Sequence, residues 1–350
     1  MAAATEKGSR ERELIVSVSP HIRSEVSVSR IMWTVSISLM PALVMGFYFF
    51  GPRAIGVVAL CIASSVFFEN VVGKAIGKPG TVSDGSAFLT GLLLGMNLPA
   101  SLWSVHPFLL HVPVLGSFFA VVITKLLFGG LGYNIFNPAL MGRAFLLVSW
   151  PRAMTTWLKP AAALVGLDAQ TTATPLGILK EQGMGKLMEV FGTKQSLYLH
   201  LLIGERAGSI GEVSALALLI GGLYLLYKKY ITWHTPLSFL ATVGILTWVF
   251  GGKSASGGLA LFTGDPILHI LSGGLMLGAF FMATDYVTGP QLRQAQVFFG
   301  IGCGLITVII RLIGGFPEGV MFSILLMNCF APLIDRLVKS RPFGFREVRA

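Results

Sequence analysis

The sequence predicts an all-α, polytopic membrane protein of about ten transmembrane helices, and three observations lead to this fold class. Of the 350 residues, 54% are hydrophobic and only 12% are charged, which gives a mean hydropathy of +0.76. Apolar runs of about 17–25 residues, the length that crosses a bilayer as a helix, recur along the chain. The basic residues gather in short segments beside these runs. An ordinary soluble domain is therefore excluded.

The apolar runs place the helices in order, and several of them contain a break. Pro41 lies inside the first span, Asp84 and Gly85 open the third, and Asn137-Pro138 opens the fifth. A membrane tolerates such breaks where the free backbone groups are buried in protein or line a cavity. We expect ten spans, near residues 31–50, 54–73, 84–99, 108–127, 135–150, 212–228, 233–250, 267–284, 296–313 and 317–336.

The positions of the basic residues predict the orientation of these spans. Lys and Arg collect in both terminal segments and in the short loops on one side, which we expect to be the cytoplasm. The longest connection, 151–211, then lies outside the cell, and the net charge of +10 reflects orientation rather than nucleic-acid binding. Residues 1–30 contain no apolar run that ends in a cleavage signal, so we expect no removable signal peptide.

An internal repeat divides the chain into two halves of five spans each. Since five is an odd number, the halves must cross the membrane in opposite directions, as an inverted repeat whose broken helices face each other near the midplane. We therefore expect a cytoplasmic segment 1–30, a first repeat 31–150, an outer loop 151–211, a second repeat 212–336 and a cytoplasmic tail 337–350. Two pairs of strings match with nearly the same spacing: Leu89 to Leu94 with Leu271 to Met276, and Lys125 to Gly130 with Arg311 to Gly315.

A polar segment, Asp168 to Leu176, opens the outer loop. Because a proline follows it, Thr174 is expected in extended backbone, with its side chain away from any helix. One interpretation is that this hydroxyl carries an attached group. The other is that Asp168 or Thr171 caps a short helix from Leu176 to Lys180.

The segment Gly204 to Ser214 leads into the sixth span. Its small residues let backbone amides at a helix N-terminus approach an anion such as a phosphate. Ser209 or Ser214 is a candidate helix cap, and Glu212 is placed favourably for the helix dipole. The segment is therefore either an anion site or a capping motif.

The segment Gly129 to Arg143 leads into the fifth span. Asn134 and Asn137 either present their amides to a ring system or cap the broken helix that follows. Arg143 lies within an apolar span, where a charge is costly unless it faces a partner, a cavity or an anion. We expect either a functional role for Arg143 or a buried ion pair.

Acidic residues at the span ends are candidates for an ion pathway. Asp285 follows the eighth span and either belongs to an ion route or caps the turn. Asp265 and Asp84, near the starts of the eighth and third spans, are comparable positions in the two repeats. Glu212 completes this candidate set.

Other kinds of site are not indicated by the sequence. The three cysteines lie in apolar segments without paired spacing, and the six histidines show no metal-ligand spacing. No phosphate-binding P-loop and no dinucleotide fingerprint is present. We therefore expect neither a metal site nor a complete active site in this chain.

Taken in order, the motifs resemble a family of membrane subunits shared by two kinds of complex. These are the Rnf complexes, which are ion-pumping ferredoxin:NAD+ oxidoreductases, and the Na+-translocating NADH:quinone reductases. The short N-terminal segment favours the Rnf branch over the matching membrane component of the reductases. Tyr286 stands where the family has proline. The similar segments are Ser19 to Ile22, Gly129 to Ala139, Asp168 to Thr174, Gly204 to Ser214 and Phe281 to Thr288.

This resemblance implies a function. Family members carry FMN bound through its phosphate to the threonine that matches Thr174, and a separate flavin transferase attaches it from FAD. The implied role is an electron relay at the outer face of a bacterial or archaeal cell membrane, between flavin and iron–sulfur carriers of neighbouring subunits, coupled to Na+ or H+ movement. Family members also hold noncovalent riboflavin in some cases. Further flavin contacts are expected at Asp168, Thr172, Asn134, Asn137, Arg143 and Ser209.

Two alternatives belong to other classes. A flavin-free, urea-type permease also uses inverted five-helix repeats with buried Asn and Gly, and needs no cofactor. A structural scaffold of a larger membrane complex would leave the segment 168–176 without a purpose.

Overall fold

The computed structural model describes residues 26–77, 81–103, 107–160, 172–253 and 259–338, and it confirms the all-helical membrane architecture. Among these residues, the only sheet is a two-residue antiparallel pairing of β1 (Gly252–Lys253) with β2 (Leu259–Ala260). Four helices are long and apolar enough to cross a membrane by themselves, and five shorter apolar helices accompany them.

The first half contains the five expected spans. Two of them are interrupted at the predicted places: Leu39 separates the first two helices, with Pro41 at the start of the second, and Asn137 caps the fifth span. The helices are α1 (Val28–Ser38) with α2 (Met40–Phe50), α3 (Pro52–Ala75), η1 (Thr81–Asp84) with α4 (Ser86–Met96), α5 (His111–Phe118) with the π-helix η4 (Phe119–Leu126), and α6 (Pro138–Ser149); η2 (Ala100–Trp103) and η3 (Pro107–Leu110) are short turns.

The connection between the halves is largely helical in its described part, whereas the sequence predicted only a short helix from Leu176 to Lys180. Leucine and isoleucine side chains of this connection form a small core of their own against Leu268 in the second half. Its elements are α7 (Pro151–Thr155), α8 (Pro175–Phe191), α9 (Lys194–Ile203) and η5 (Ile210–Glu212).

The second half repeats the pattern of five spans. Its third span is again broken, between Leu271 and Leu275. The elements are α10 (Ala215–Tyr227), α11 (His234–Phe250), α12 (Pro266–Leu271) with α13 (Leu275–Leu277) and the π-helix η6 (Gly278–Met282), α14 (Arg293–Leu312), and α15 (Val320–Leu337).

The breaks in the two third spans have the same local cause. Gly85 (φ 80°) and Gly273 (φ 67°) both adopt left-handed backbone, which residues with a Cβ rarely tolerate. The sequence match had paired Gly91 with Gly273, but Gly91 lies inside α4, whereas Gly273 lies at a break. Short strings of Gly and Leu do not determine how the two halves align residue by residue.

The basic residue that ends the fourth span of each half lies against these breaks. Lys125 Nζ donates to Ser86 Oγ at 2.6 Å, and Arg311 Nη2 donates to the Ser272 carbonyl at 3.2 Å; both pairs are 39 residues apart. Lys125 shares a cavity with Ile31 at the start of α1, whereas Arg311 shares one with α8 and α9. Equivalent contacts thus form at opposite ends of the bundle, as an inverted repeat requires.

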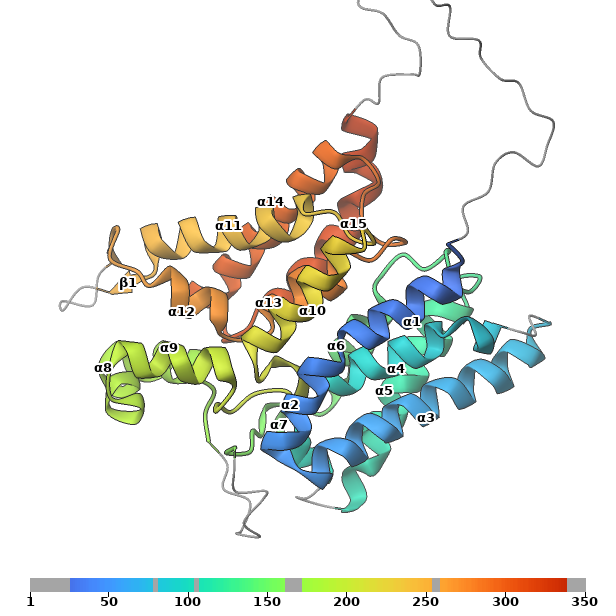
Figure 1. Ribbon diagram of the computed structural model, residues 1–350, viewed down its shortest axis with the longest axis horizontal. Helices are drawn as coiled ribbons and strands as arrows, with labels where there is room; N and C mark the ends of the chain where they lie inside the picture. Colours follow the sequence, from blue (N-terminus) through green and yellow to red (C-terminus); the bar gives the residue numbers. More distant parts are fainter. Residues whose placement is uncertain (1–25, 78–80, 104–106, 161–171, 254–258, 339–350) are drawn as a thin grey trace, which may run out of the picture.

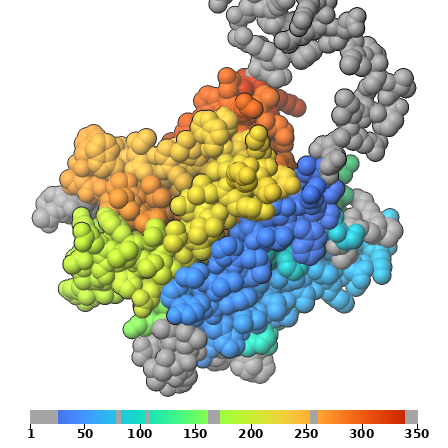
Figure 2. Space-filling view, viewed as in Figure 1, coloured from blue at the N-terminus to red at the C-terminus, as the bar shows by residue number. Residues whose placement is uncertain are grey.

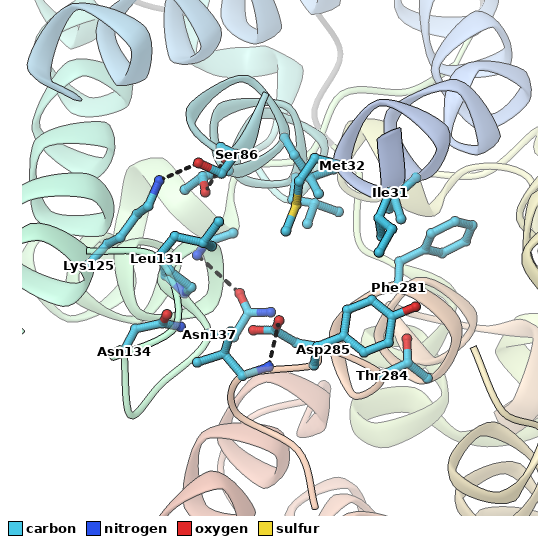
Figure 3. A pocket seen from close by; sticks show the side chains of 18 of the residues that line it. Ile31, Met32, Ser86, Lys125, Leu131, Asn134, Asn137, Phe281, Thr284 and Asp285 are labelled. Carbon is cyan, nitrogen blue, oxygen red and sulfur yellow. Dashed lines mark hydrogen bonds between the residues drawn. The ribbon is translucent and has the colours of Figure 1, made fainter. Parts of the chain in front are cut away.

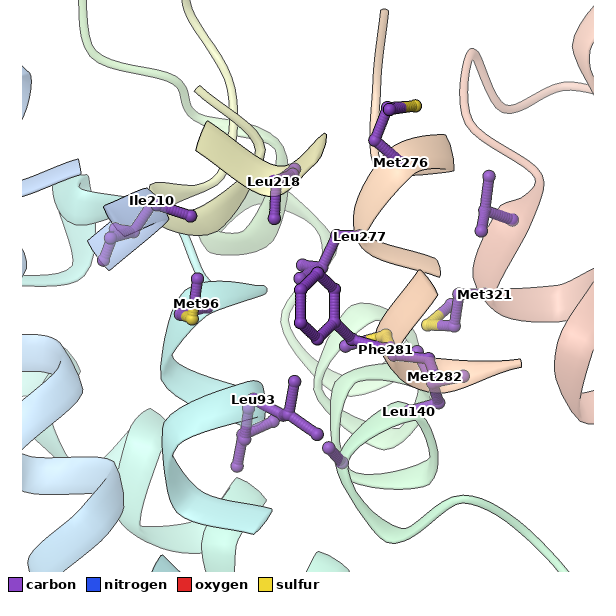
Figure 4. Close-up of a cluster of buried hydrophobic side chains, with 14 of the residues drawn as sticks. Leu93, Met96, Leu140, Ile210, Leu218, Met276, Leu277, Phe281, Met282 and Met321 are labelled. Atoms are coloured by element: carbon purple, nitrogen blue, oxygen red, sulfur yellow. The ribbon is translucent and has the colours of Figure 1, made fainter. Parts of the chain in front are cut away.

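The two halves pack against each other through apolar side chains near the centre of the molecule. Figure 4 shows side chains from α4, α6, η5, α10, the α13–η6 helix and α15 meeting in one cluster. On the surface, α10 of the second half lies along α1 and α2 of the first (Figures 1 and 2). The start of α1 and the end of α15 lie at one end of the bundle, and α7, α8 and α9 lie at the other (Figure 1).

Candidate functional site

Thr174 lies at the start of α8, at the end of the bundle that is opposite the termini. Its backbone is extended as predicted (φ −68°, ψ 155°), because Pro175 follows it. Its side chain, however, does not point away from the helix: Oγ1 accepts a hydrogen bond from Gly177 N–H at 3.1 Å and caps α8. The side chain is buried, with 6% of its surface exposed.

A cavity of about 400 Å³ opens beside Thr174, and we call it the Thr174 cavity. Such a volume lies within the range of small-molecule sites, about 300–1,000 Å³. Thr172 and Arg143, both predicted flavin contacts, line it too. Its other walls are mainly apolar, with two carboxylates: Leu147, Met154, Trp157, Gly177, Glu181, Phe316, Glu318, Val320, Met321 and Phe322.

Arg143 joins the first half of the chain to the second. Nη1 donates to Glu212 Oε1 at 3.2 Å, and Nη2 donates to Glu318 Oε2 at 3.1 Å. Nη1 also donates to Asn97 Oδ1 at 2.9 Å, at the end of α4. The ion pair that the sequence offered as one interpretation of Arg143 is therefore present, and the same side chain also borders the Thr174 cavity.

Arg206 holds the break of the eighth span. It is buried and donates to three backbone carbonyl groups, those of Leu271 (2.6 Å), Val213 (3.2 Å) and Glu212. The adjacent Glu212 side chain is also buried, and its Oε2 finds no hydrogen-bond partner among the described residues. Arg206 supplies donors to carbonyl groups that a broken helix leaves free.

Asn134, Asn137 and Asp285 lie together at the other end of the bundle, around a cavity of about 80 Å³ that we call the Asp285 cavity (Figure 3). Asn137 caps α6 by accepting from the amides of Ala139 and Leu140 at 3.1 and 3.3 Å. The structure therefore does not bring these asparagines to the Thr174 cavity, where the resemblance had implied a shared flavin.

Within the Asp285 cavity, some polar groups retain hydrogen-bonding capacity. Asn134 Oδ1 is buried and has no hydrogen-bond partner in the part of the chain that is described. Asp285 accepts from the Val287 amide at 3.4 Å and the Thr288 hydroxyl at 3.1 Å, so it caps its turn and also lines the cavity.

The two other candidate aspartates cap helices. Asp84 Oδ1 accepts from the Ser86 amide at 2.7 Å and from the Ser86 hydroxyl at 2.5 Å, at the start of α4. Asp265 Oδ1 accepts from the Leu268 amide at 3.1 Å, and its Oδ2 accepts from the Tyr198 hydroxyl at 2.5 Å. Burial, followed by the Asp265 carboxylate, raises the pKa of Tyr198 to about 12, so this tyrosine remains a donor at neutral pH.

Ser209, another predicted flavin contact, does not line the Thr174 cavity within the described structure. Ser209 is fully buried next to η5, and its hydroxyl has no partner among the described residues. Ser214, the other candidate cap of the sixth span, is the residue that caps α10. Asp168 lies outside the described residues.

Sequence reasoning missed several charged residues that the structure places in these networks. Glu69 forms a buried ion pair with Lys125 at 2.7 Å, and Glu318 pairs with Arg143. Lys180 donates to three carbonyl groups at the end of α14 and beyond it, among them Phe316 at 2.9 Å. Glu69 and Lys125 could have been identified from the sequence, since each is a charged residue within an apolar span. Glu318 lies at the edge of the predicted tenth span and Lys180 at the end of the predicted short helix, where a charge is ordinary and indicates no partner.

The chain is similar to known proteins along nearly its whole length. The model of the family described as "NQR2, RnfD, RnfE family" matches residues 15–344. The D subunit of the proton-translocating ferredoxin:NAD(+) oxidoreductase complex of Clostridium ljungdahlii is 53% identical over 332 residues, 95% of this chain and 96% of its own. The D subunit of the Na(+)-translocating ferredoxin:NAD(+) oxidoreductase complex of Acetobacterium woodii is 47% identical over 344 residues, 97% of this chain and 98% of its own.

A third relative, from Stutzerimonas stutzeri, is named as the D subunit of an ion-translocating oxidoreductase complex and is 39% identical over 340 residues, 91% of this chain and 92% of its own. All three names belong to the branch that the short N-terminal segment favoured. A urea-type permease is therefore set aside as the family of this chain. Similarity over nearly the whole length shows that the chain belongs to the NQR2, RnfD, RnfE family.

Proposed function

We propose that this chain is the flavin-carrying membrane subunit of an ion-translocating ferredoxin:NAD+ oxidoreductase complex, with FMN linked through its phosphate to Thr174 Oγ1. The relatives' names and the family support the assignment to the complex. The observation that carries the flavin proposal is the position of the Thr174 hydroxyl, at the start of a helix and on the wall of a cavity of about 400 Å³.

The residues around this hydroxyl fit the chemistry of FMN. A phosphate on Thr174 would lie at the N-terminus of α8, where the helix dipole favours negative charge, and Arg143 lines the same cavity. Trp157, Phe316 and Phe322 offer apolar walls to a ring system, while the Glu181 and Glu318 carboxylates repel the phosphate from their side. When bound, FMN supplies electron transfer, and the chain supplies attachment and orientation.

The attachment of FMN to Thr174 involves no change of oxidation state and so needs no redox partner. A transferase that uses FAD breaks the diphosphate bond of FAD, the Thr174 oxygen bonds to the FMN phosphorus, AMP leaves, and the hydroxyl proton is lost. The neighbouring subunits, with their own flavin and iron–sulfur carriers, then exchange electrons with the attached group.

The first prediction concerns the bond to Thr174. When the full chain is expressed with the flavin transferase, its denatured gel band should fluoresce under ultraviolet light and its intact mass should exceed that of the bare chain by one FMN. Thr174→Ala should lose both signals. Thr174→Asn should lose them too and still cap α8, because asparagine is a good N-cap residue without a hydroxyl.

The controls separate attachment from folding. Thr172→Ala and Thr171→Ala should keep the fluorescence, and Thr174→Ser, which keeps a hydroxyl, should retain it at least in part. Fluorescence that persists in Thr174→Asn would place the flavin elsewhere and refute the proposal. Flavin that Thr174→Ala releases on denaturation would be the noncovalent riboflavin that some family members hold.

We further propose that the Asp285 cavity is part of the ion route of the complex. Most of its polar lining bears oxygen: Ser86, Thr90, Asn134, Asn137, Thr284, Asp285 and Tyr286. Lys125 also lines it, and its ammonium is paired with Glu69 at 2.7 Å. Oxygen ligands suit hard cations, and a volume of about 80 Å³ accommodates an ion with a few waters rather than a ring system. Glu212 is a second buried carboxylate, at the contact between the halves.

The second prediction compares two aspartates within the assembled complex. Asp285→Asn should reduce ion uptake into inverted vesicles, driven by reduced ferredoxin and NAD+, at least about tenfold, since intramembrane carboxylates mark ion pathways. Asp265→Asn should transport normally if Asp265 acts as a cap, because asparagine also caps helices. Flavin fluorescence should be unchanged in both. Transport by Asp285→Asn at the wild-type rate would exclude this route.

A further inference from the structure

A second large cavity, of about 630 Å³, lies beside α8 and α9 and is separate from the Thr174 hydroxyl. We call it the His269 cavity. Its walls come from α8, α9, the end of α11, α12 and the end of α14, so it opens at the end of the bundle opposite the termini. No function described above uses it.

Two buried side chains on its wall have unsatisfied nitrogen atoms. His269 and Arg311 each expose only 4% of their surface. Arg311 gives its Nη1 and Nη2 protons to the carbonyls of His269 (2.6 Å) and Ser272 (3.2 Å), but its Nε finds no partner among the described residues, and neither does His269 Nδ1. Arg311 Nε always carries a proton, and His269 Nδ1 carries one in one neutral tautomer, so each is an unused donor.

The charge of the cavity favours an anion. Lys180, Lys194 and Arg311 line it against a single carboxylate, that of Asp265, which already accepts from Tyr198 and from the amide of Leu268. Lys194 is the first residue of α9, where the positive end of the helix dipole makes a cation locally unfavourable. An anion at the mouth of the cavity would remove this conflict.

The remaining walls suit an amphiphile. Trp248 and Ile267 line the cavity and are 48% and 49% exposed. They lie near the end of one span and the start of another, where tryptophan characteristically meets the lipid headgroup region. Leu176, Met184 and Leu312 continue the apolar surface inward. Basic pockets between transmembrane helices are known to bind anionic headgroups.

We propose that the His269 cavity binds an anionic phospholipid of the leaflet that contacts α8 and α9. Its phosphate lies near Arg311 and Lys194, and an acyl chain lies along Trp248. The proposal does not depend on the flavin, because Thr174 does not line this cavity, and a Thr174→Ala chain should bind the lipid like the wild type.

The test is a titration of the full purified chain by native mass spectrometry with phosphatidylglycerol, phosphatidylcholine and inorganic phosphate. Phosphatidylglycerol should bind best. Lys194→Gln should weaken it about fivefold, the usual effect of one basic residue near a lipid surface. Trp248→Ala should weaken both lipids. The matched control is Lys186→Gln, an exposed lysine on α8 that does not line the cavity, which should bind like the wild type.

Three outcomes would overturn the proposal. Equal binding of phosphatidylcholine and phosphatidylglycerol would show that the basic residues do not select an anion. Unchanged affinity in Lys194→Gln would place the lipid elsewhere. Displacement of phosphatidylglycerol by millimolar inorganic phosphate would identify a site for small anions instead of lipid.

Discussion

The side chain of Arg143 connects the two halves of this molecule. Its guanidinium pairs with Glu212 and Glu318 of the second half and with Asn97 of the first. The sequence identified it correctly as a charge that needs a partner, because an arginine in an apolar span is costly alone. It could not identify Glu318, which lies 175 residues away in a connecting segment.

The third prediction follows from this network. Arg143→Gln leaves two carboxylates without their counter-charge and should destabilise the chain by about 3–5 kcal/mol, the usual cost of breaking a buried pair. Adding Glu318→Gln should restore part of this loss. The measurement is the midpoint of thermal unfolding in detergent, with the exposed Arg152→Gln as control. A midpoint equal to that of wild type would show that the two carboxylates do not need Arg143.

At the scale of elements, the sequence predicted the breaks that have a local cause. Pro41 and the Asn137-Pro138 pair interrupt or start helices where they stand in the chain, because proline and a capping side chain act on their own neighbours. The break of the third span was located near its true position through Asp84 and Gly85, whereas the matching break between Leu271 and Leu275 was not located. The residue-by-residue match of the two halves was less accurate, since Gly91 is an interior helix residue that allows close packing on α3.

Other elements could not be predicted, because their cause lies elsewhere in the fold. The π-helices η4 and η6 have sequences that suit an ordinary helix, and no local residue marks the change. The helices α8 (17 residues) and α9 (10 residues) contain polar residues along their length. They bury their apolar faces against each other and against Leu268 of α12, a contact that no local pattern reveals.

At the scale of the whole molecule, the ten predicted spans match the observed helices closely, and the inverted relation of the halves explains the paired contacts of Lys125 and Arg311. The candidate site was predicted less completely. Thr174, Thr172 and Arg143 do share one cavity, whereas Asn134 and Asn137 belong to another. A sequence motif indicates candidate site residues, but it does not indicate at which end of the helical bundle each side chain lies.

The fourth prediction concerns the orientation of the molecule. We expect both termini in the cytoplasm, which would put α8 outside the cell and the end of α3 inside. In a chain with Cys329→Ser, a membrane-impermeant maleimide should label Lys186→Cys in intact cells and should label Lys74→Cys only after permeabilisation. The native Cys61 and Cys303 are buried and should not react. Labelling of Lys74→Cys in intact cells would reverse the orientation.

The amino group of Lys180 connects the segment that carries Thr174 to the second half of the chain. By binding the carbonyls of Ile310, Gly314 and Phe316, it anchors the first turns of α8 to the far end of α14. Although Thr174 precedes the second repeat in the sequence, it is mechanically fixed to that repeat. Any sliding of α14 along its axis will therefore move the threonine oxygen with it, and with that oxygen the flavin that we propose it carries.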